Sequence, residues 1–123
     1  MKIIITHSSP DWDAIGSVWF IKRFLPGWEN AEVRFVSAGQ RFRNIAFMNE
    51  KADDPIEKND GDEMIHVDTG LGPLDHHQTF DMNMCAASLT WNYVKTKNPE
   101  FRVQSDRIQT KIEALERMVK VLV

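Results

Sequence analysis

Aspartate and histidine side chains gather in two short segments of this chain, each just after a run of apolar residues. The first segment follows Ile3-Ile4-Ile5 and holds His7, Asp11 and Asp13. The second follows Met64-Ile65-His66-Val67 and holds Asp68 and the triplet Asp75-His76-His77. Carboxylates and imidazoles are common ligands of divalent metal ions. The two segments together predict one metal site built from both.

The elements that must position these residues alternate between strand and helix. Apolar patterning predicts strands at residues 3–6, 32–36 and 63–68, and helices at residues 13–24, 86–97 and 105–123. Pro26-Gly27 ends the first helix, and Gly16 is expected to let that helix pack closely on the sheet. The charged segment 51–62 contains Pro55 and Gly61 and predicts a surface loop. We expect an α/β fold of three layers, with a mainly parallel sheet and helices on both faces.

Composition limits the classes of protein that this chain can represent. Its 123 residues suit a single domain, and the 42% apolar and 27% charged residues are ordinary for a globular protein. The net charge of -3 excludes the broad basic surface of a general nucleic-acid binder. Cys85 is the only cysteine, which excludes an internal disulfide and a cysteine-rich zinc site. No segment resembles a signal peptide or a membrane span, so we expect a cytoplasmic protein without membrane contact.

The predicted strands suggest how the two polar segments meet. In an open α/β sheet, ligands bind where strands end, and His7 and Asp68 stand at such ends. Two ionised carboxylates about 5 Å apart repel by roughly 3 kcal/mol at an effective dielectric near 20, so such a cluster favours a bound cation. A mixed Asp and His set without thiolate suits Mn²⁺, with Mg²⁺, Co²⁺, Fe²⁺ or Zn²⁺ as alternatives.

A pair of metal ions would give this site hydrolytic chemistry. Two ions roughly 3.5 to 4 Å apart can activate a water and clamp the attacking and leaving oxygens of a displacement at phosphorus. Asp68 lies between the two segments in the chain and is the natural bridging ligand. His77 would then be free to contact a phosphate oxygen or to assist the leaving group.

Simpler interpretations stand beside the metal site. A polar loop and a helix N-cap explain the segment from His7 to Asp13 about equally well, because Asp favours helix starts. A surface turn would explain the triplet alone, and His66 is more simply a core or supporting histidine. Arg41 and Arg43 are candidates for binding a substrate phosphate, although a solvated surface is the favoured interpretation. Core or interface packing suffices to explain Trp12, which is also near enough to the site to stack on a base.

The motifs resemble, in order, the first three motifs of the DHH phosphoesterase superfamily. The matching residues are His7-x-x-Pro-Asp11-x-Asp13-Ala14-x-Gly16-Ser17, then Asp68, then Asp75-His76-His77. This superfamily includes RecJ-type exonucleases, oligonucleotide phosphodiesterases and family II inorganic pyrophosphatases. The resemblance implies a phosphoesterase with two Mn²⁺ ions that hydrolyses a phosphodiester or phosphoanhydride, such as an oligonucleotide or nucleotide.

By similarity, His7, Asp11 and Asp68 would hold one ion, and Asp13, Asp68 and His76 the other. His76, His77 and Asp75 would be the catalytic residues of the triplet, with His77 nearest the substrate. The further Asp and the second, substrate-binding domain of that superfamily have no counterpart here, so we expect residues 1–123 to be one domain, incomplete at its C-terminus.

Two other roles follow from these departures. The alternative to an enzyme is a non-catalytic module that binds a metal ion, a phosphate or nucleotide, or a partner protein. Separately, the apolar segment 118–123 predicts a homodimer through the C-terminal helix.

Overall fold

The computed structural model describes residues 1–37, 40–44, 54–70, 72–75 and 85–122. Its centre is a mixed four-stranded sheet with the strand order β2-β1-β4-β3. The strands are β1 (Lys2–His7), β2 (Glu32–Val36), β3 (Ile56–Asn59) and β4 (Asp62–His66). β1 pairs in parallel with β2 and β4, whereas β3 is antiparallel to β4. The predicted α/β class is confirmed.

β3 and β4 form a hairpin in a segment that the sequence predicts as a surface loop, so that prediction is wrong for residues 56–59. Asp60 and Gly61 connect the two strands with φ values of 50° and 84°. Two consecutive positive φ values suit a two-residue turn whose twist matches that of the flanking strands. The Asp-Gly pair is itself a hairpin signal, but the high charge of the segment outweighed it in the prediction.

Three helices match the predicted segments: α1 (Trp12–Phe24), α2 (Ala86–Lys97) and α3 (Asp106–Leu122). Two short 3-10 helices, η1 (Phe42–Asn44) and η2 (Pro99–Arg102), accompany them. α1 begins after Asp11, whose Oδ1 accepts a hydrogen bond of 2.9 Å from Ala14 N. It ends at Phe24, and the capping residue Leu25 directly precedes Pro26-Gly27, which is the predicted stop.

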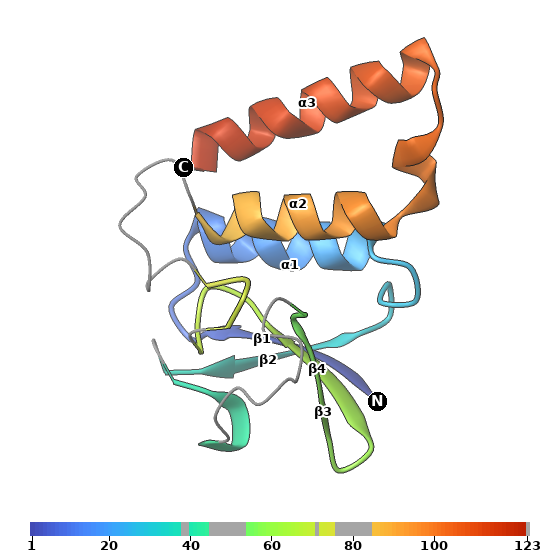
Figure 1. The fold of residues 1–123 in the computed structure, drawn as a ribbon. Coiled ribbons are helices and arrows are strands. Elements are labelled where there is room, and N and C mark those ends of the chain that lie inside the picture. The colour runs from blue at the N-terminus through green and yellow to red at the C-terminus, as the bar shows by residue number, and fades with distance from the viewer. Residues whose placement is uncertain (38–39, 45–53, 71, 76–84, 123) are drawn as a thin grey trace.

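The helices lie on one side of the sheet, with α1 and α2 next to it and α3 outside them (Figure 1). Ile4, Ile65 and Val67 join the core that the helices cover. Ile3, Ile5 and Met64 alternate to the opposite face, where Val36 and Phe42 pack against them. Within the described residues, the expected helix layer on this second face is not seen, because the described chain between β2 and β4 forms η1 and β3 instead of a helix that could cover it.

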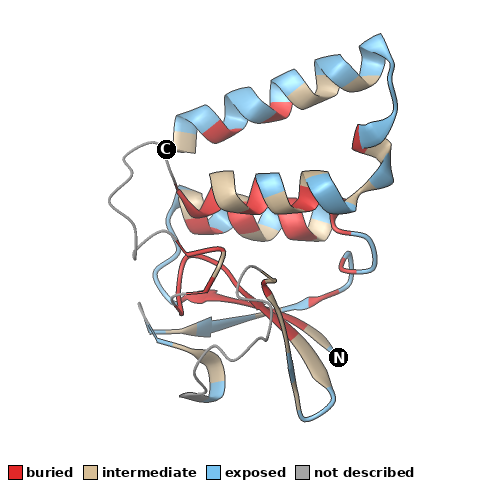
Figure 2. Cartoon of the chain, viewed as in Figure 1, coloured by how far each residue is buried: buried red, intermediate tan, exposed pale blue. Residues whose placement is uncertain are grey.

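Buried residues concentrate between the sheet and the pair α1 and α2, whereas α3 is largely exposed (Figure 2). Phe24 and Trp91 each contact Phe101, with ring centroids 5.4 Å and 5.2 Å away, and tie α1 and α2 to η2. Among the described residues of α3, only Leu115 and Val119 are buried. None of the helices in the described part of the chain has the length and apolar character needed to cross a bilayer.

Candidate metal centre

His7 and Asp68 meet at the carboxyl ends of β1 and β4. The parallel register pairs Ile5 with His66, and Val67 N continues it with a hydrogen bond of 2.8 Å to Ile5 O. His7 and Asp68 each lie two residues beyond this pair, and His7 Nε2 is 3.0 Å from Asp68 Oδ2. Both residues are buried, with 8% and 2% of their surface exposed. Parallel pairing therefore brings together two residues that are far apart in the sequence.

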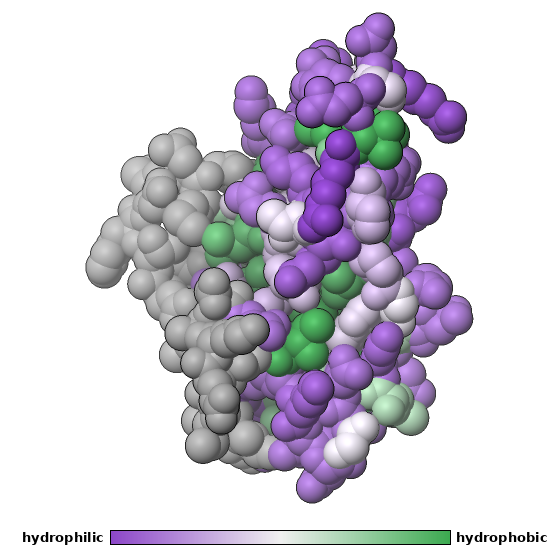
Figure 3. Space-filling model, turned by 45° about the vertical axis from the view of Figure 1, so that its right-hand side comes forward, coloured by the Kyte–Doolittle hydropathy of each residue, from purple (hydrophilic) through white to green (hydrophobic). Residues whose placement is uncertain are grey.

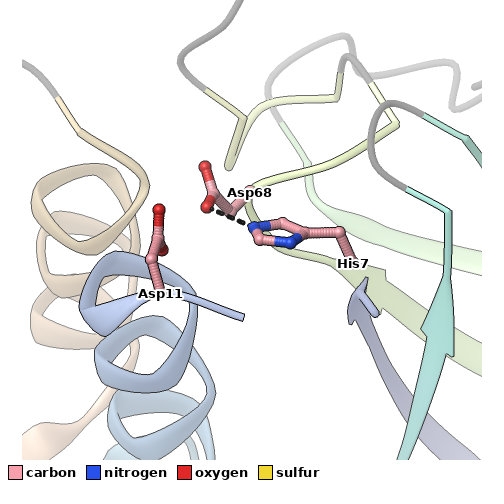
Figure 4. A group of neighbouring side chains, drawn as sticks. All are labelled: His7, Asp11 and Asp68. Atoms are coloured by element: carbon pink, nitrogen blue, oxygen red, sulfur yellow. Dashed lines mark hydrogen bonds and ion pairs between the residues drawn. The ribbon is translucent and has the colours of Figure 1, made fainter. Parts of the chain in front are cut away.

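Asp11 completes a cluster with these two residues (Figure 4). One ligand atom from each of His7, Asp11 and Asp68 lies within 4.8 Å of the others. Asp11 is exposed, and its hydrogen bond to Ala14 N fixes its carboxylate at the start of α1. The N-cap predicted as the simpler interpretation is thus present, and the same side chain also faces the candidate metal centre.

The backbone of Asp68 adopts a left-handed conformation, with φ of 56°. For a residue with a side chain this costs on the order of 1 kcal/mol, and such strain gathers at functional sites. The turn is closed by a hydrogen bond of 3.0 Å from Asp68 N to Leu74 O. The strained turn directs the carboxylate towards His7 and Asp11 rather than along the strand.

The donor atoms of this cluster fit a hard divalent cation. Metal bonds of about 2.1 Å at right angles place neighbouring ligand atoms about 3 Å apart, and Nε2 of His7 and Oδ2 of Asp68 are 3.0 Å apart. The carboxylates of Asp11 and Asp68 repel by up to roughly 3 kcal/mol, which a cation would relieve and which solvent screens partly at Asp11. His7 Nδ1 is buried and has no hydrogen-bond partner among the described residues. Imidazole and carboxylate without thiolate suit Mn²⁺ or Mg²⁺.

Asp13, predicted as a ligand of the second ion, contacts the start of α2. Its Oδ2 accepts a hydrogen bond of 3.0 Å from Ala86 N, and its Oδ1 accepts one of 2.7 Å from Ala87 N. These amides belong to the first turn of α2, where a carboxylate also meets the positive end of the helix dipole. The structure thus brings His7, Asp11 and Asp68 together and directs the Asp13 carboxylate to α2.

The predicted triplet is described only in part. Asp75 is buried, with 2% of its surface exposed, and its N donates a hydrogen bond of 3.1 Å to Gly72 O. It directly follows Leu74, which is bonded to Asp68, so Asp75 belongs to the same turn. His76 and His77 lie outside the described residues.

Arg41 and Arg43, the candidate phosphate ligands, both contact the β3–β4 hairpin. Arg41 is largely buried, donates a hydrogen bond of 2.6 Å to Gly70 O and forms an ion pair with Glu57. Arg43 donates a 2.8 Å hydrogen bond to Asp62, which holds the pKa of that carboxyl below its ordinary value. A solvated surface is the favoured interpretation for both arginines; Arg43 is exposed, whereas the side chain of Arg41 is largely buried.

Behind the Asp68 turn lies a hydrogen-bonded group that sequence reasoning missed. Glu57 Oε2 lies 2.8 Å from His66 Nδ1, and His66 Nε2 accepts a hydrogen bond of 3.0 Å from Phe42 N. Because Nε2 accepts, the ring proton is on Nδ1 and is donated to Glu57. Glu57 thus links Arg41 to the buried His66, and Arg41 in turn holds Gly70. Glu57 was missed because its segment was predicted as a loop; the Asp60-Gly61 hairpin signal could have placed it on a strand.

Comparisons with protein-family models, curated proteins and solved structures found no match. The class of the protein therefore rests on its own geometry. It is a small α/β protein with a mixed four-stranded sheet and a His/Asp cluster at the carboxyl ends of two parallel strands. A cluster of this composition can hold a divalent metal ion.

Proposed function

We propose that this chain is a divalent-metal-dependent phosphoesterase that hydrolyses a phosphodiester or phosphoanhydride, with Mn²⁺ as the preferred ion. The observation that carries the proposal is the convergence of His7, Asp11 and Asp68 within 4.8 Å. The cluster lies at the carboxyl ends of adjacent parallel strands, where open α/β sheets bind their ligands. The order of the sequence motifs, which resembles that of DHH phosphoesterases, supports the same reaction.

Each residue of the cluster has a distinct part in this proposal. Bound between His7, Asp11 and Asp68, the ion supplies positive charge that polarises the phosphoryl group and lowers the pKa of water. The buried His7 and the strained Asp68 hold their ligand atoms in fixed orientations. Asp11 stands at the start of α1, so a phosphate at this site would also meet the positive end of the dipole of that helix.

The proposal extends to the remaining residues of the triplet and to a second ion. His76 would complete a second site with Asp68, while His77 would contact the phosphate. Asp75, buried in the same turn as Asp68, would support that carboxylate. A full three-layer DHH fold, two Mn²⁺ ions and a nucleotide or short oligonucleotide as substrate belong to this proposal, as does a cytoplasmic location.

A second candidate is a non-catalytic module that binds a metal ion, a phosphate or a nucleotide. The observation that favours it is the position of the Asp13 carboxylate, both of whose oxygens accept backbone hydrogen bonds from α2. Because Asp13 is hydrogen-bonded to α2, the predicted second ion would have one ligand fewer. One ion can bind a phosphate without hydrolysing it.

Binding of Mn²⁺ to the wild-type chain and to Asp68→Asn tests the metal centre. Asn tolerates the left-handed backbone of residue 68, so this change removes charge and a ligand with little effect on folding. Asp60→Asn is the matched control, because Asp60 also has a positive φ, 50°, but lies in the hairpin turn away from the cluster. Electron paramagnetic resonance of free Mn²⁺ measures the affinity directly.

We expect Asp68→Asn to weaken Mn²⁺ binding by about tenfold or more and Asp60→Asn to leave it unchanged. Equal affinity in all three proteins would rule out this metal centre. Hydrolysis of bis(p-nitrophenyl) phosphate in the presence of Mn²⁺ then separates the two candidate functions. Turnover that is lost in Asp68→Asn supports the enzyme, whereas tight Mn²⁺ binding without turnover supports the binding module.

The predicted homodimer is a separate proposal. Met118 and Val121 on α3 are exposed and are the side chains that such an interface would bury. Sedimentation at several protein concentrations tests the dimer independently of metal binding.

A further inference from the structure

A groove of about 740 Å³ runs between α1 and α3. Its walls include Trp12, Ile15 and Trp19, which follow one face of α1 at helical spacing, and Met118 and Val121 from the last turns of α3. These five side chains are among the eight exposed large apolar residues of the described chain. Exposed apolar residues that gather in one place, rather than being scattered singly, mark a binding surface.

The described face shown in Figure 3 is mainly hydrophilic, with small and separate apolar patches. The groove also has the size of small-molecule sites, which span about 300 to 1,000 Å³ and combine apolar and aromatic walls with a few polar groups.

The groove and the candidate metal centre share one residue. Asp11 lines the groove and also contributes a ligand atom to the cluster with His7 and Asp68. Trp12 is the next residue and has 76% of its surface exposed. A group attached to a phosphate at the metal centre therefore has the groove directly beside it, with an aromatic ring at its mouth.

The charge of the groove restricts what that group can be. Among the described residues that line it there is no Lys or Arg, and its two charged members are Asp11 and Asp13. Additional phosphates, as in pyrophosphate or polyphosphate, would be repelled by these carboxylates and would meet apolar walls. A flat, uncharged ring can instead stack on Trp12 and exclude water from the apolar surface.

We propose that the groove between α1 and α3 binds the base of a nucleotidyl substrate whose phosphate lies at His7, Asp11 and Asp68. This inference rests on the proposed function and selects its substrate class: phosphoesters of nucleosides, rather than inorganic phosphoanhydrides. Trp12 is then a specificity-determining residue. The predicted homodimer competes with this assignment, because a second copy seated in the groove would cover the same Met118 and Val121.

Calorimetric titration of the Mn²⁺-loaded chain with thymidine 5′-monophosphate and with inorganic phosphate tests the proposal without requiring turnover. We expect the nucleotide to bind about tenfold or more tightly than phosphate. Trp12→Ala should abolish this difference and leave phosphate binding unchanged, whereas Trp12→Phe, which keeps a ring, should preserve most of it. Trp12 is exposed, so neither change is expected to affect folding.

Three outcomes would overturn the proposal. If nucleotide and phosphate bind with equal affinity to the Mn²⁺-loaded wild type, the groove does not bind the base. This result would leave the proposed metal centre standing. If Trp12→Ala retains the full preference, the base binds elsewhere. If the chain is a dimer that Trp12→Ala or Val121→Ser converts to monomer, a second copy occupies the groove. Failure to bind Mn²⁺ would instead remove the proposed function on which the inference rests.

Discussion

Asp13 on α1 accepts a hydrogen bond of 2.7 Å from the backbone N of Ala87, at the start of α2. The second oxygen of the same carboxylate accepts one of 3.0 Å from Ala86 N. Capping of a helix by its own N-cap residue is common, but here the carboxylate comes from a different helix. This contact fixes the ends of α1 and α2 to each other beside the candidate metal centre.

Asp13→Ala should lower the free energy of unfolding by about 1 to 2 kcal/mol in the absence of metal, because two amides of α2 lose their acceptor and the helix dipole loses a charge. Asp13→Asn should cost less, since its amide oxygen can still accept one hydrogen bond. Urea denaturation of metal-free protein measures both. If Asp13→Ala were as stable as wild type and instead weakened Mn²⁺ binding, Asp13 would be a metal ligand and not a cap.

Glu57 joins Arg41 and His66 behind the Asp68 turn, and Glu57→Gln removes its charge while keeping its size. We expect the free energy of unfolding to fall by about 2 kcal/mol, because a largely buried charged hydrogen bond is lost. Mn²⁺ binding should also weaken, since Arg41 holds Gly70 O next to the Asp68 turn.

The matched control for this change is Glu32→Gln. Glu32 also pairs with an arginine, Arg34, but this pair is exposed and should contribute less than about 1 kcal/mol. Similar losses of stability in the two variants would show that the Glu57 contacts are no stronger than a surface ion pair.

Gly16 is predicted to let α1 pack closely on the sheet. In the structure it faces α3 and α2 instead. A Cβ at this position would come within 2.8 Å of Leu122 Cδ1 and 3.9 Å of Ala87 Cβ. Gly16→Ala should be tolerated, because the end of the Leu122 side chain can move and alanine improves helix propensity by about 1 kcal/mol. Gly16→Leu should displace α3 and raise amide hydrogen exchange along residues 106–122.

A second substitution provides the control for that displacement. Leu122→Ala removes the side chain that the new leucine would meet, so Gly16→Leu combined with Leu122→Ala should restore much of the protection of α3. Equal exchange in the single and double variants would mean that Gly16 does not set the approach of α3 to α1.

Tyr93 is the only tyrosine of the chain, so phenolate absorbance reports on it alone. Burial, together with the negative charge of Asp54, raises the pKa of Tyr93 from 10.0 to about 12. The folded state keeps the phenol protonated at pH values where the unfolded state releases the proton. The free energy of unfolding should therefore fall as the pH rises from about 10 towards about 12.

A spectroscopic pH titration of the folded chain checks this prediction. A midpoint close to that of a free tyrosine would contradict the proposed effect of burial on the pKa of Tyr93. Asp54→Asn should lower the midpoint only slightly, because burial is the larger cause of the shift.

Much of the fold could be predicted because most of its elements carry a local signal. The β-branched run Ile3-Ile4-Ile5, the Pro26-Gly27 stop and the apolar spacing of residues 105–123 are properties of neighbouring residues, and β1, α1 and α3 follow them. The β3 strand was missed because its four residues are mostly polar, so its pairing with β4 depends on the turn rather than on its own pattern.

The candidate site was likewise predictable only in part. Residue types and strand ends predicted that His7, Asp11 and Asp68 would approach one another, and parallel pairing of β1 and β4 does bring them together. The metal itself stays a prediction. By contrast, Asp11 and Asp13 are both acidic and lie close in the sequence, so nothing local indicated that one faces the cluster and the other caps α2.

The sequence by itself determined most of the elements of this protein and which of its polar side chains can serve as metal ligands, because propensity and ligand type are properties of short segments. Only the tertiary structure decided the partner of each side chain: Asp13 with the α2 amides, Arg41 with Glu57 and Gly70, and Gly16 with Leu122. These partners depend on distances between residues far apart in the chain. The packing of helices on a sheet fixes such distances, and no local pattern encodes them.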